Sequence, residues 1–588
     1  MNIAQRMSKK LEFVRRLGLC PSVLNLYVDR YSFGFLLGDI YAGIKMFCLL
    51  FPLAISLAFF CGGGPVQGVI SCAIAAGVGA ILGGSKYQIS SIALPICILT
   101  FDILVKYQYK GLFYTALFTS LILILFGFLK ISNVLKHISY AFISALIIFV
   151  ALSIVINQLQ HLLDIHTIHS SQGIFENFAL LCDNMENVTK PALISATLFL
   201  IPIIALKLFY RGFFAFFAYL AVGCIVTWAL NTGVIPDLLD VKTVAQEMIS
   251  TQSALDTIFT MSSTAPSHTF LSNIVDYAFV IALIIACEAC FCTSVSASLS
   301  GDNRLQTNVE LISNGIANFV SVALGGLFVS PDIDLSVKNI KIKSKTVLPM
   351  IIISILCFGT IYFNDIIIKF IPMGCLSSIL LIYAISEIMH KRIRQYFNIK
   401  SQETHIFWIT LLLCVYFGFI PAAIIGFAIS CVFFASRMVK IKDANVHTTR
   451  NHDTGAIEFI SNKQGFSQSM NIPPKILNKI EVIQVTNILF LNIAKIVEEA
   501  FAAQGKFPEI VIIYFNNVPY LDNDAFDALK ELVKNAKAHK ATVMISGTNG
   551  ILLDIIQQKA RSEKFNDAFG YVVPNFKEAI RQTVKRLG

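Results

Sequence analysis

Long apolar runs, separated by short polar stretches, make up most of residues 39–437. About 20 predominantly apolar residues are needed to cross a bilayer as a helix, and by this length rule the pattern predicts about fourteen segments that span or half-span the membrane. Their apolar runs begin near Asp39, Val66, Ser90, Gly111, Ile138, Pro191, Gly212, Asp276, Leu311, Pro331, Val347, Ile366, His405 and Pro421.

The pattern changes after Arg437. From about Ala456, short runs typical of strands alternate with amphipathic helical patterns, which predicts a soluble α/β domain. Strands are expected at 456–460, 488–493, 509–515 and 542–546, and helices near 494–504, 524–538, 549–560 and 575–587. We therefore expect an N-terminal segment (1–38), a transmembrane domain (39–437), a linker (438–455) and a C-terminal α/β domain (456–588).

Composition agrees with this division. Of the 588 residues, 56% are hydrophobic and 14% are charged, and the mean hydropathy is +0.70. These values are typical of a polytopic membrane protein with a soluble part. The first thirty residues carry several cations without an apolar core, so no cleavable signal peptide is expected. The cysteines lie mostly inside apolar runs, where they are read as small buried side chains and not as disulfides.

Positive residues gather in alternate loops, which predicts the orientation of the chain. With the N-terminus inside, the outer loops keep only Lys106, Lys110, Lys190 and Lys242, whereas the inner loops collect many more cations. Both termini are therefore expected in the cytoplasm. The loops 159–190 and 232–273 then face outward, and segment 172–187 is expected to lie as an interfacial helix. The net charge of +10 is explained by these loops and implies no nucleic acid.

Two interrupted apolar stretches contain the candidate binding residues. The stretch 325–339 has two glycines and Pro331 to end one helix, and Asp332 and Asp334 to begin the next, because carboxylates suit a helix N-terminus. The stretch 83–95 is interrupted in a similar way. Broken helices at membrane depth are tolerated where they are buried in protein or line a cavity, and in transporters they form the substrate site.

The two stretches occupy matching places in two halves of the chain. Ser90 follows Asp39 at nearly the same spacing at which Ser330 follows Asp276. Seven segments in each half is an odd number, so the halves are expected to be inverted repeats. The two half-helices would then point their N-termini at each other and form an anion cradle. The candidate substrate-binding residues are Ser90, Ser91, Ser330, Ile333 and Ser336.

Glu288 is the only ionisable side chain, apart from cysteines, in the apolar run 278–297. A charge at membrane depth costs roughly 2.5–3.5 kcal/mol, so such residues usually face a cavity and have a function. A neutral, hydrogen-bonded structural glutamate is the alternative. No second ligand set with metal-site spacing accompanies the nearby cysteines, so no metal site is expected. Glu288 and Asp332 are the candidate residues for a coupling ion.

The motifs resemble those of the sulfate permease family of anion transporters. The first span keeps Asp39, Ala42, Gly43 and Pro52, and GGSKYQ follows at 83–88. The stretch RLQTNVELISNGIANFVSVALGG at 304–326 is more specific, and Ser336 and Asn339 continue the pattern. The resemblance implies core and gate domains with an elevator-like movement. It also implies that the position of Glu288 bears on cation coupling.

The C-terminal domain resembles a STAS domain, the regulatory module of this family. NVPYLDNDAFDAL at 517–529 matches its strand-to-helix loop, in which Asp522 is a plausible N-cap. Phosphorylated relatives carry a serine or threonine where this chain has Asp524, so phosphorylation is not expected there. The resemblance implies a role in docking a cytoplasmic protein or in assembly, with a homodimer as the expected state.

Several positions depart from the family pattern. Ser91, Ile92 and Ala93 stand where the family often has Gly-Pro-Thr, and Leu53 and Leu57 stand where its first span usually carries a glutamine and an aromatic residue. Leu335 stands where an arginine is usual, and Asp332 and Asp334 stand where small residues are usual. A site that loses a cation and gains carboxylates attracts anions less well. The substrate of a typical member therefore cannot be transferred directly to this chain.

The sequence as a whole predicts a secondary active transporter of small inorganic or organic anions, coupled to H⁺ or Na⁺ and embedded in lipid. No nucleophile elbow, nucleotide loop or metal motif is present, so neither an enzyme nor a cofactor is expected. Two alternatives remain: a nucleobase-type permease of the same architecture, and a non-transporting sensor or scaffold that signals through the STAS domain.

Overall fold

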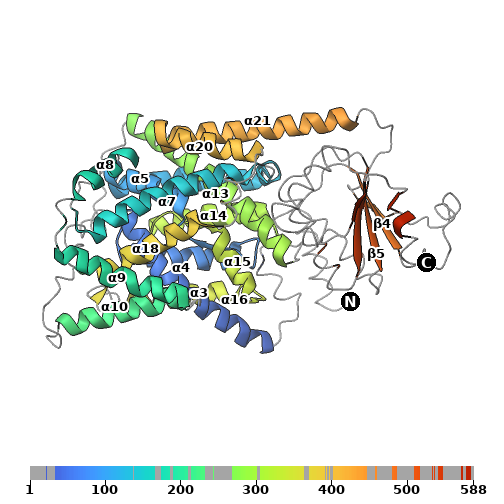
Figure 1. Cartoon of the computed structure of the whole chain (residues 1–588). Coiled ribbons are helices and arrows are strands. Elements are labelled where there is room, and N and C mark those ends of the chain that lie inside the picture. The colour runs from blue at the N-terminus through green and yellow to red at the C-terminus, as the bar shows by residue number, and fades with distance from the viewer. Residues whose placement is uncertain are drawn as a thin grey trace, which may run out of the picture. The chain divides into compact units, whose positions relative to one another are not determined.

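The computed structural model places most of the membrane part and several elements of the C-terminal part (Figure 1). The chain divides into two compact units, Met1–Phe434 and Ala435–Gly588, and each is described by itself. The described residues are 22, 33–136, 138–165, 174–185, 188, 190–209, 214–231, 243, 268–300, 305–362, 370–390, 393, 396, 402–445, 457–459, 480–486, 509–516, 533, 536, 541–546, 571–573, 578–579 and 581–583.

Helices make up nearly all of the described part of the first unit. The first half contains α3 (Phe33–Phe60), α4 (Pro65–Leu82), β1 (Ile89–Ser91), α5 (Leu94–Phe128), α6 (Ser132–Leu135), α7 (Tyr140–Leu162), α8 (Ile174–Asp183), α9 (Lys190–Phe209) and α10 (Ala215–Asn231). The second half contains α13 (His268–Ser300), α14 (Thr307–Ala323), β2 (Ser330–Asp332), α15 (Ile333–Lys341), α16 (Leu348–Tyr362), α18 (Met373–Ile388), α20 (Gln402–Phe417) and α21 (Phe419–Asn445). The helix expected within 172–187 is present as α8.

The longest helix, α5, contains a sharp break. Gln108 has a φ of 54° and a ψ of −164°, which lie outside the helical region. A straight helix of 35 residues would be about 52 Å long, whereas the hydrocarbon core of a bilayer is about 30 Å thick. The break therefore divides α5 into a shorter helix before Gln108 and a longer one after it, in agreement with the separate apolar runs predicted near Ser90 and Gly111.

The described helices of this unit carry many apolar side chains on their outer surface. Six described helices are long and apolar enough to cross a bilayer, and shorter apolar helices accompany them. Large apolar side chains are exposed on several of these helices, among them Leu125, Ile201, Ile225, Leu412 and Val432. Exposed apolar area of this extent is expected where lipid covers a protein. The predicted helical membrane protein is confirmed.

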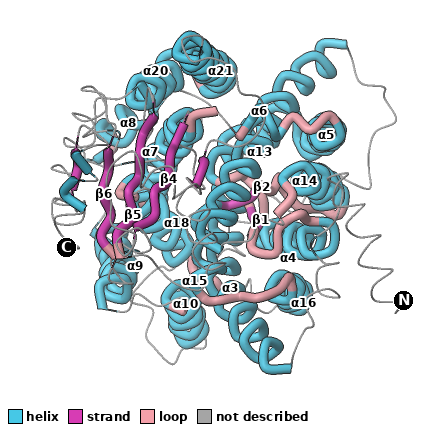
Figure 2. The backbone as a smooth tube through the Cα atoms, turned by 90° about the vertical axis from the view of Figure 1, so that its right-hand side faces the viewer, coloured by secondary structure: helices cyan, strands magenta, loops and turns pink. Residues whose placement is uncertain are grey.

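Most of the described helices pack into two groups. The first, which we call the core bundle, consists of α3, α4, α5, α13, α14 and α16, with β1, β2 and α15 packed among them. The second, the gate bundle, consists of α7, α9, α10, α18 and α20. The two bundles meet where α3 contacts α10 and α18, and where α7 contacts α5 and α13. In Figure 2 the short strands β1 and β2 lie in the middle of the helices of the core bundle.

The second unit contains a five-stranded sheet in the order β3-β4-β5-β6-β7 (Figure 2). Its strands are β3 (Ile457–Phe459), β4 (Ile480–Thr486), β5 (Ile510–Asn516), β6 (Thr542–Ser546) and β7 (Tyr571–Val573). β3 pairs antiparallel with β4, and the other pairs are parallel. Parallel neighbours need crossover connections, which agrees with the predicted alternation of strands and helices.

The strands expected at 456–460, 509–515 and 542–546 are present, whereas β4 and β7 were not expected. The strand expected at 488–493 lies outside the described residues. So do most residues of the four expected helices, although Val533, Ala536 and Ala579 are helical and buried. β4 was missed because the apolar run that follows it, ILFLNI, gives a stronger strand signal than the alternating sequence IEVIQVT.

Candidate functional site

The two interrupted stretches come together through the antiparallel pairing of β1 and β2. Ile89 pairs with Asp332, Ser90 with Pro331, and Ser91 with Ser330. A helix begins directly after each strand: α5 at Leu94 and α15 at Ile333. Because the strands run in opposite directions, the N-terminal ends of the two helices approach each other from opposite sides. Sequence reasoning predicted this juxtaposition from the repeat.

The two helices begin differently. Ala93 is the N-cap of α5 and supplies no side-chain hydrogen bond. Asp332 is the N-cap of α15, and its Oδ1 accepts a hydrogen bond from the Leu335 N–H at 2.9 Å. A carboxylate at this position satisfies one of the free N–H groups of the first turn and interacts well with the helix dipole. The predicted start of a helix at Asp332 is therefore confirmed.

Ser336 connects the two interrupted stretches. Its Oγ donates to the Asp332 carbonyl at 2.7 Å and accepts from the Ile89 N–H at 2.9 Å. The Cys292 thiol on α13 donates to the same Oγ at 3.1 Å. The hydroxyl of this candidate residue is thus fully used in holding β1, α15 and α13 together. Ile333, the other candidate on α15, is 9% exposed at the first helical position.

Glu288 lies on α13 and is buried against β2. The Ser330 hydroxyl donates a short hydrogen bond to Glu288 Oε2. Both side chains are nearly inaccessible, with 5% of Glu288 and none of Ser330 exposed. Within the part of the chain that the structure describes, no ion pair involves Glu288. The structure therefore brings a candidate coupling residue and a candidate binding residue into direct contact.

Asparagines on α14 support the opposite side of the strands. The Ser90 hydroxyl donates to Asn314 Oδ1 at 3.3 Å. Asn318 Oδ1 accepts from the Val329 N–H, and its Nδ2 donates to the Val329 carbonyl, both at 2.9 Å. These side chains belong to the motif at 304–326 but were not predicted as site residues. Their helical spacing of four residues was the available signal, because it places both on one face of α14.

A second buried carboxylate holds the entry to β1. Glu310, 2% exposed, accepts hydrogen bonds at Oε2 from the Gly84 N–H at 2.6 Å and from the Ser85 N–H at 3.1 Å. Sequence reasoning did not single out this residue, because its partners lie in another segment. Glu310 fixes the backbone that leads into the strand carrying Ser90 and Ser91.

Asp332 also reaches the gate bundle. The hydroxyl of Tyr383 on α18 donates to Asp332 Oδ2 at 3.1 Å. Near it, Asp334 Oδ1 lies 3.5 Å from His390 Nε2. These two contacts join the start of α15 to α18 and the residues after it. Sequence reasoning expected Asp332 near the site but gave no sign of Tyr383.

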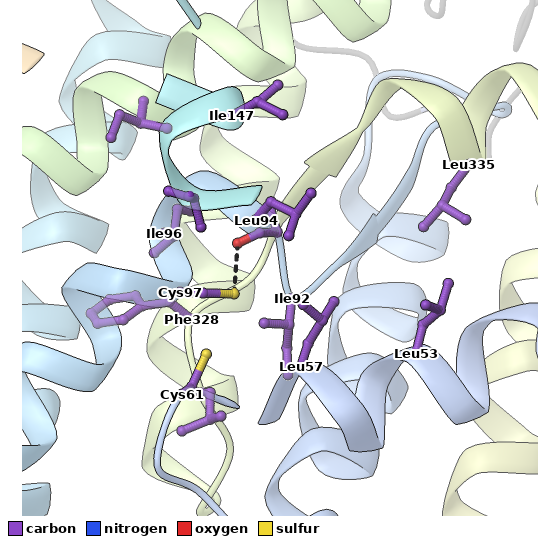
Figure 3. Close-up of a cluster of buried hydrophobic side chains, with 14 of the residues drawn as sticks. Leu53, Leu57, Cys61, Ile92, Leu94, Ile96, Cys97, Ile147, Phe328 and Leu335 are labelled. Carbon is purple, nitrogen blue, oxygen red and sulfur yellow. Dashed lines mark hydrogen bonds between the residues drawn. The ribbon is translucent and has the colours of Figure 1, made fainter. Parts of the chain in front are cut away.

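Apolar side chains lie between the helix starts and α3 (Figure 3). Leu53 and Leu57 on α3 lie in one buried cluster with Ile92 and Leu335, and each is no more than 3% exposed. Leu335 extends toward Leu53 in Figure 3. These are positions at which the sequence departs from the family pattern. Among the described residues, no group of three or more potential ligands could hold a metal ion.

Comparisons with known proteins agree with this architecture. A model described as the sulfate permease family matches residues 36–410, and one described as the STAS domain matches residues 473–579. The chain is 22% identical to YvdB of Bacillus subtilis (strain 168), covering 87% of this chain and 91% of that protein. It is 20% identical to the bicarbonate transporter BicA of Picosynechococcus sp., with 90% of each chain covered.

Among solved structures, that of SLC26A9 aligns with a TM-score of 0.60 at 16% identity, covering 99% of this chain and 94% of that one. The likeness shows the fold, an inverted repeat of seven and seven segments followed by a STAS domain, as predicted. The family model matches well over half of this chain. The chain therefore belongs to the sulfate permease family, a family of transporters and not of enzymes.

Proposed function

We propose that this protein is a secondary active transporter of small anions of the sulfate, bicarbonate or dicarboxylate class. The anion would bind between the N-terminal ends of α5 and α15 and reach each side of the membrane in turn. The supporting observation is the pairing of β1 with β2, which brings the two helix starts together at a buried position. Helix N-termini attract anions through free N–H groups and the positive end of the dipole.

The proposed binding residues are Ser90, Ser91, Ser330, Ile333 and Ser336. Because the hydroxyls of Ser330 and Ser336 already have partners within the protein, backbone N–H groups would supply much of the contact with the anion. The α5 end is the more available of the two, since its N-cap, Ala93, has no side chain that competes for them.

The negative charges of the candidate carboxylates and of the substrate suggest coupling to a cation. An anion about 4 Å from an ionised carboxylate meets roughly 4 kcal/mol of repulsion at an effective dielectric near 20. A helix N-terminus stabilises a nearby anion by at most about 2 kcal/mol, which is less than this repulsion. A cation that neutralises Glu288 or Asp332 would therefore bind cooperatively with the anion. We favour H⁺ over Na⁺, because Glu288 is buried and burial disfavours the charged carboxylate; the hydroxyl of Ser330, which donates to Glu288 Oε2, opposes this only in part.

The proposal is tested with purified protein in liposomes. Uptake of labelled sulfate, bicarbonate, a dicarboxylate or uracil is measured with and without proton and Na⁺ gradients. We expect uptake of at least one anion to rise when the outside is more acidic than the inside, because protons then flow inward with the anion. Uptake of uracil alone would favour the nucleobase-type permease, and no uptake at all would favour the sensor or scaffold.

Glu288→Gln mimics the protonated acid and is the decisive variant. It should still bind the anion but lose the acceleration by an inward proton gradient. Glu176→Gln, at an exposed position of α8, is the matched control and should respond to the gradient as the wild type does. If the Glu288→Gln variant keeps its gradient response, or if wild-type uptake ignores both gradients, the coupling proposal is wrong and an exchanger or channel replaces it.

We further propose that the transport domain spans residues 39–437 and that a linker, 438–455, connects it to a regulatory domain, 456–588. Both termini would lie in the cytoplasm, where the STAS domain would support a homodimer or dock a cytoplasmic protein. The match of residues 473–579 to the STAS domain supports the identity of this regulatory domain.

A further inference from the structure

The carboxylate of Asp332 lies where a half-helix of this kind would meet a substrate anion. Its Oδ1 caps α15 through the Leu335 N–H, and its Oδ2 accepts the hydroxyl hydrogen of Tyr383. One N–H of the first turn and a donor from the opposite helix bundle are therefore already bound to an anion that belongs to the chain itself.

The same carboxylate joins two groups of helices that pack separately. Asp332 begins α15 in the core bundle, whereas Tyr383, 6% exposed, lies on α18 in the gate bundle. A movement of one bundle along the other has to break this hydrogen bond. A second contact, between Asp334 on α15 and His390 just after α18, is partly exposed and therefore weaker.

We propose that Asp332 is a built-in competitor of the substrate. In the absence of an anion it fills the α15 half of the binding site and ties the core bundle to Tyr383, and a small oxyanion or carboxylate has to displace it. This inference rests on the proposed anion transport. It makes Asp332 a specificity-determining residue, because its repulsion of a substrate grows with the charge of that substrate.

The titratable groups around Asp332 contain more acids than bases. Those that interact with it electrostatically are Glu288 and Cys292 on α13, Asp334 and Lys338 on α15, and Tyr383 and Glu387 on α18. The Cys292 thiol and the Tyr383 hydroxyl are neutral hydrogen-bond donors, and the three other carboxyl groups outnumber the single cation, Lys338. Coulomb repulsion from one carboxylate is twice as large for a dianion as for a monoanion at the same position. The site should therefore favour bicarbonate over sulfate.

Asp332→Asn removes the charge while asparagine keeps the N-cap function. At about 4–8 Å and an effective dielectric near 20, one unit charge corresponds to roughly 30- to 1000-fold in affinity. Because Lys338 and the helix dipole offset part of this, we expect the KM for bicarbonate to fall about tenfold, and the KM for sulfate by about the square of that factor. Asp334→Asn is the matched control, because Asp334 does not cap α15 and its carboxylate is partly exposed beside His390, where solvent screens its charge. It should change either KM less than about threefold.

Uptake of labelled bicarbonate and sulfate into liposomes measures both constants. Equal changes for the two anions, or equal effects of the two Asn variants, would overturn the inference. The proposed function itself does not depend on this result, because coupled uptake by the wild type would stand in either case.

A second measurement does not require transport. Tyr383→Phe removes the hydroxyl that holds Asp332, and Tyr219→Phe removes a hydroxyl that bonds to the Phe199 carbonyl within the gate bundle. Because the Tyr219 hydroxyl also interacts with Ser378 and Cys375 on α18, only α15 distinguishes the two variants. Hydrogen exchange in detergent without added anion should become faster in 333–341 for Tyr383→Phe, and remain slow there for Tyr219→Phe. If the wild type moves no anion, the proposed function fails, whereas this difference still supports the Asp332 contact. Equal exchange in both variants would refute the contact.

Discussion

Glu310 accepts two backbone hydrogen bonds that fix the segment leading into β1. Removing this acceptor should lower the stability of the protein by a predictable amount. Glu310→Ala leaves the N–H groups of Gly84 and Ser85 buried without their acceptor. An unsatisfied buried donor costs about 1–3 kcal/mol, so the expected loss of stability is about 2–6 kcal/mol. Glu310→Gln keeps a neutral acceptor oxygen and should lose roughly half as much, because hydrogen bonds to charged acceptors are about twice as strong.

Thermal unfolding followed by fluorescence-detected size-exclusion chromatography measures this effect. We expect the Tm of Glu310→Ala to fall by on the order of 5 °C, with Glu310→Gln in between. Glu176→Ala, which removes an exposed carboxylate on α8, should leave the Tm unchanged. Below its Tm, the Glu310→Ala protein should also take up anion more slowly, because Ser90 and Ser91 follow the released backbone. If all three variants melt with the wild type, Glu310 does not stabilise β1 and the reasoning is wrong.

Three further predictions concern the orientation of the chain and its C-terminal domain. A single cysteine in 232–273 should react with impermeant reagents from outside, whereas one in 389–402 should not; the reverse pattern would overturn the orientation derived from the positive residues. A fragment beginning at Ala456 should fold alone, as circular dichroism and cooperative melting would show, because its alternating elements supply their own core. Deleting it should leave the membrane part inserted but change assembly or transport rate, and unchanged behaviour in both assays would exclude a regulatory role.

The outline of the fold could be predicted because it depends on local properties of the chain. The length of an apolar run fixes whether a helix can cross the membrane, and the repeat of interrupted stretches indicates where half-helices occur. The start of α15 at Asp332 was predictable for the same reason, since a cap and its helix are neighbours in sequence. In the C-terminal unit, the apolar run 488–493 gave a stronger strand signal than the sequence of β4, so a strand was predicted at 488–493 and β4 was missed.

The sequence by itself thus determined the membrane segments, the two broken helices and the set of polar residues at membrane depth. The tertiary structure alone decided which of these residues meet. Glu288 and Ser330 are 42 residues apart, Asp332 and Tyr383 are 51 apart, and Ser90 and Asn314 are 224 apart. Hydropathy and helix periodicity report only on near neighbours, whereas buried polar groups find partners wherever packing brings a donor to an acceptor. The contact of Asp332 with the gate bundle, on which its proposed role depends, is therefore a property of the packed helices and not of any single segment.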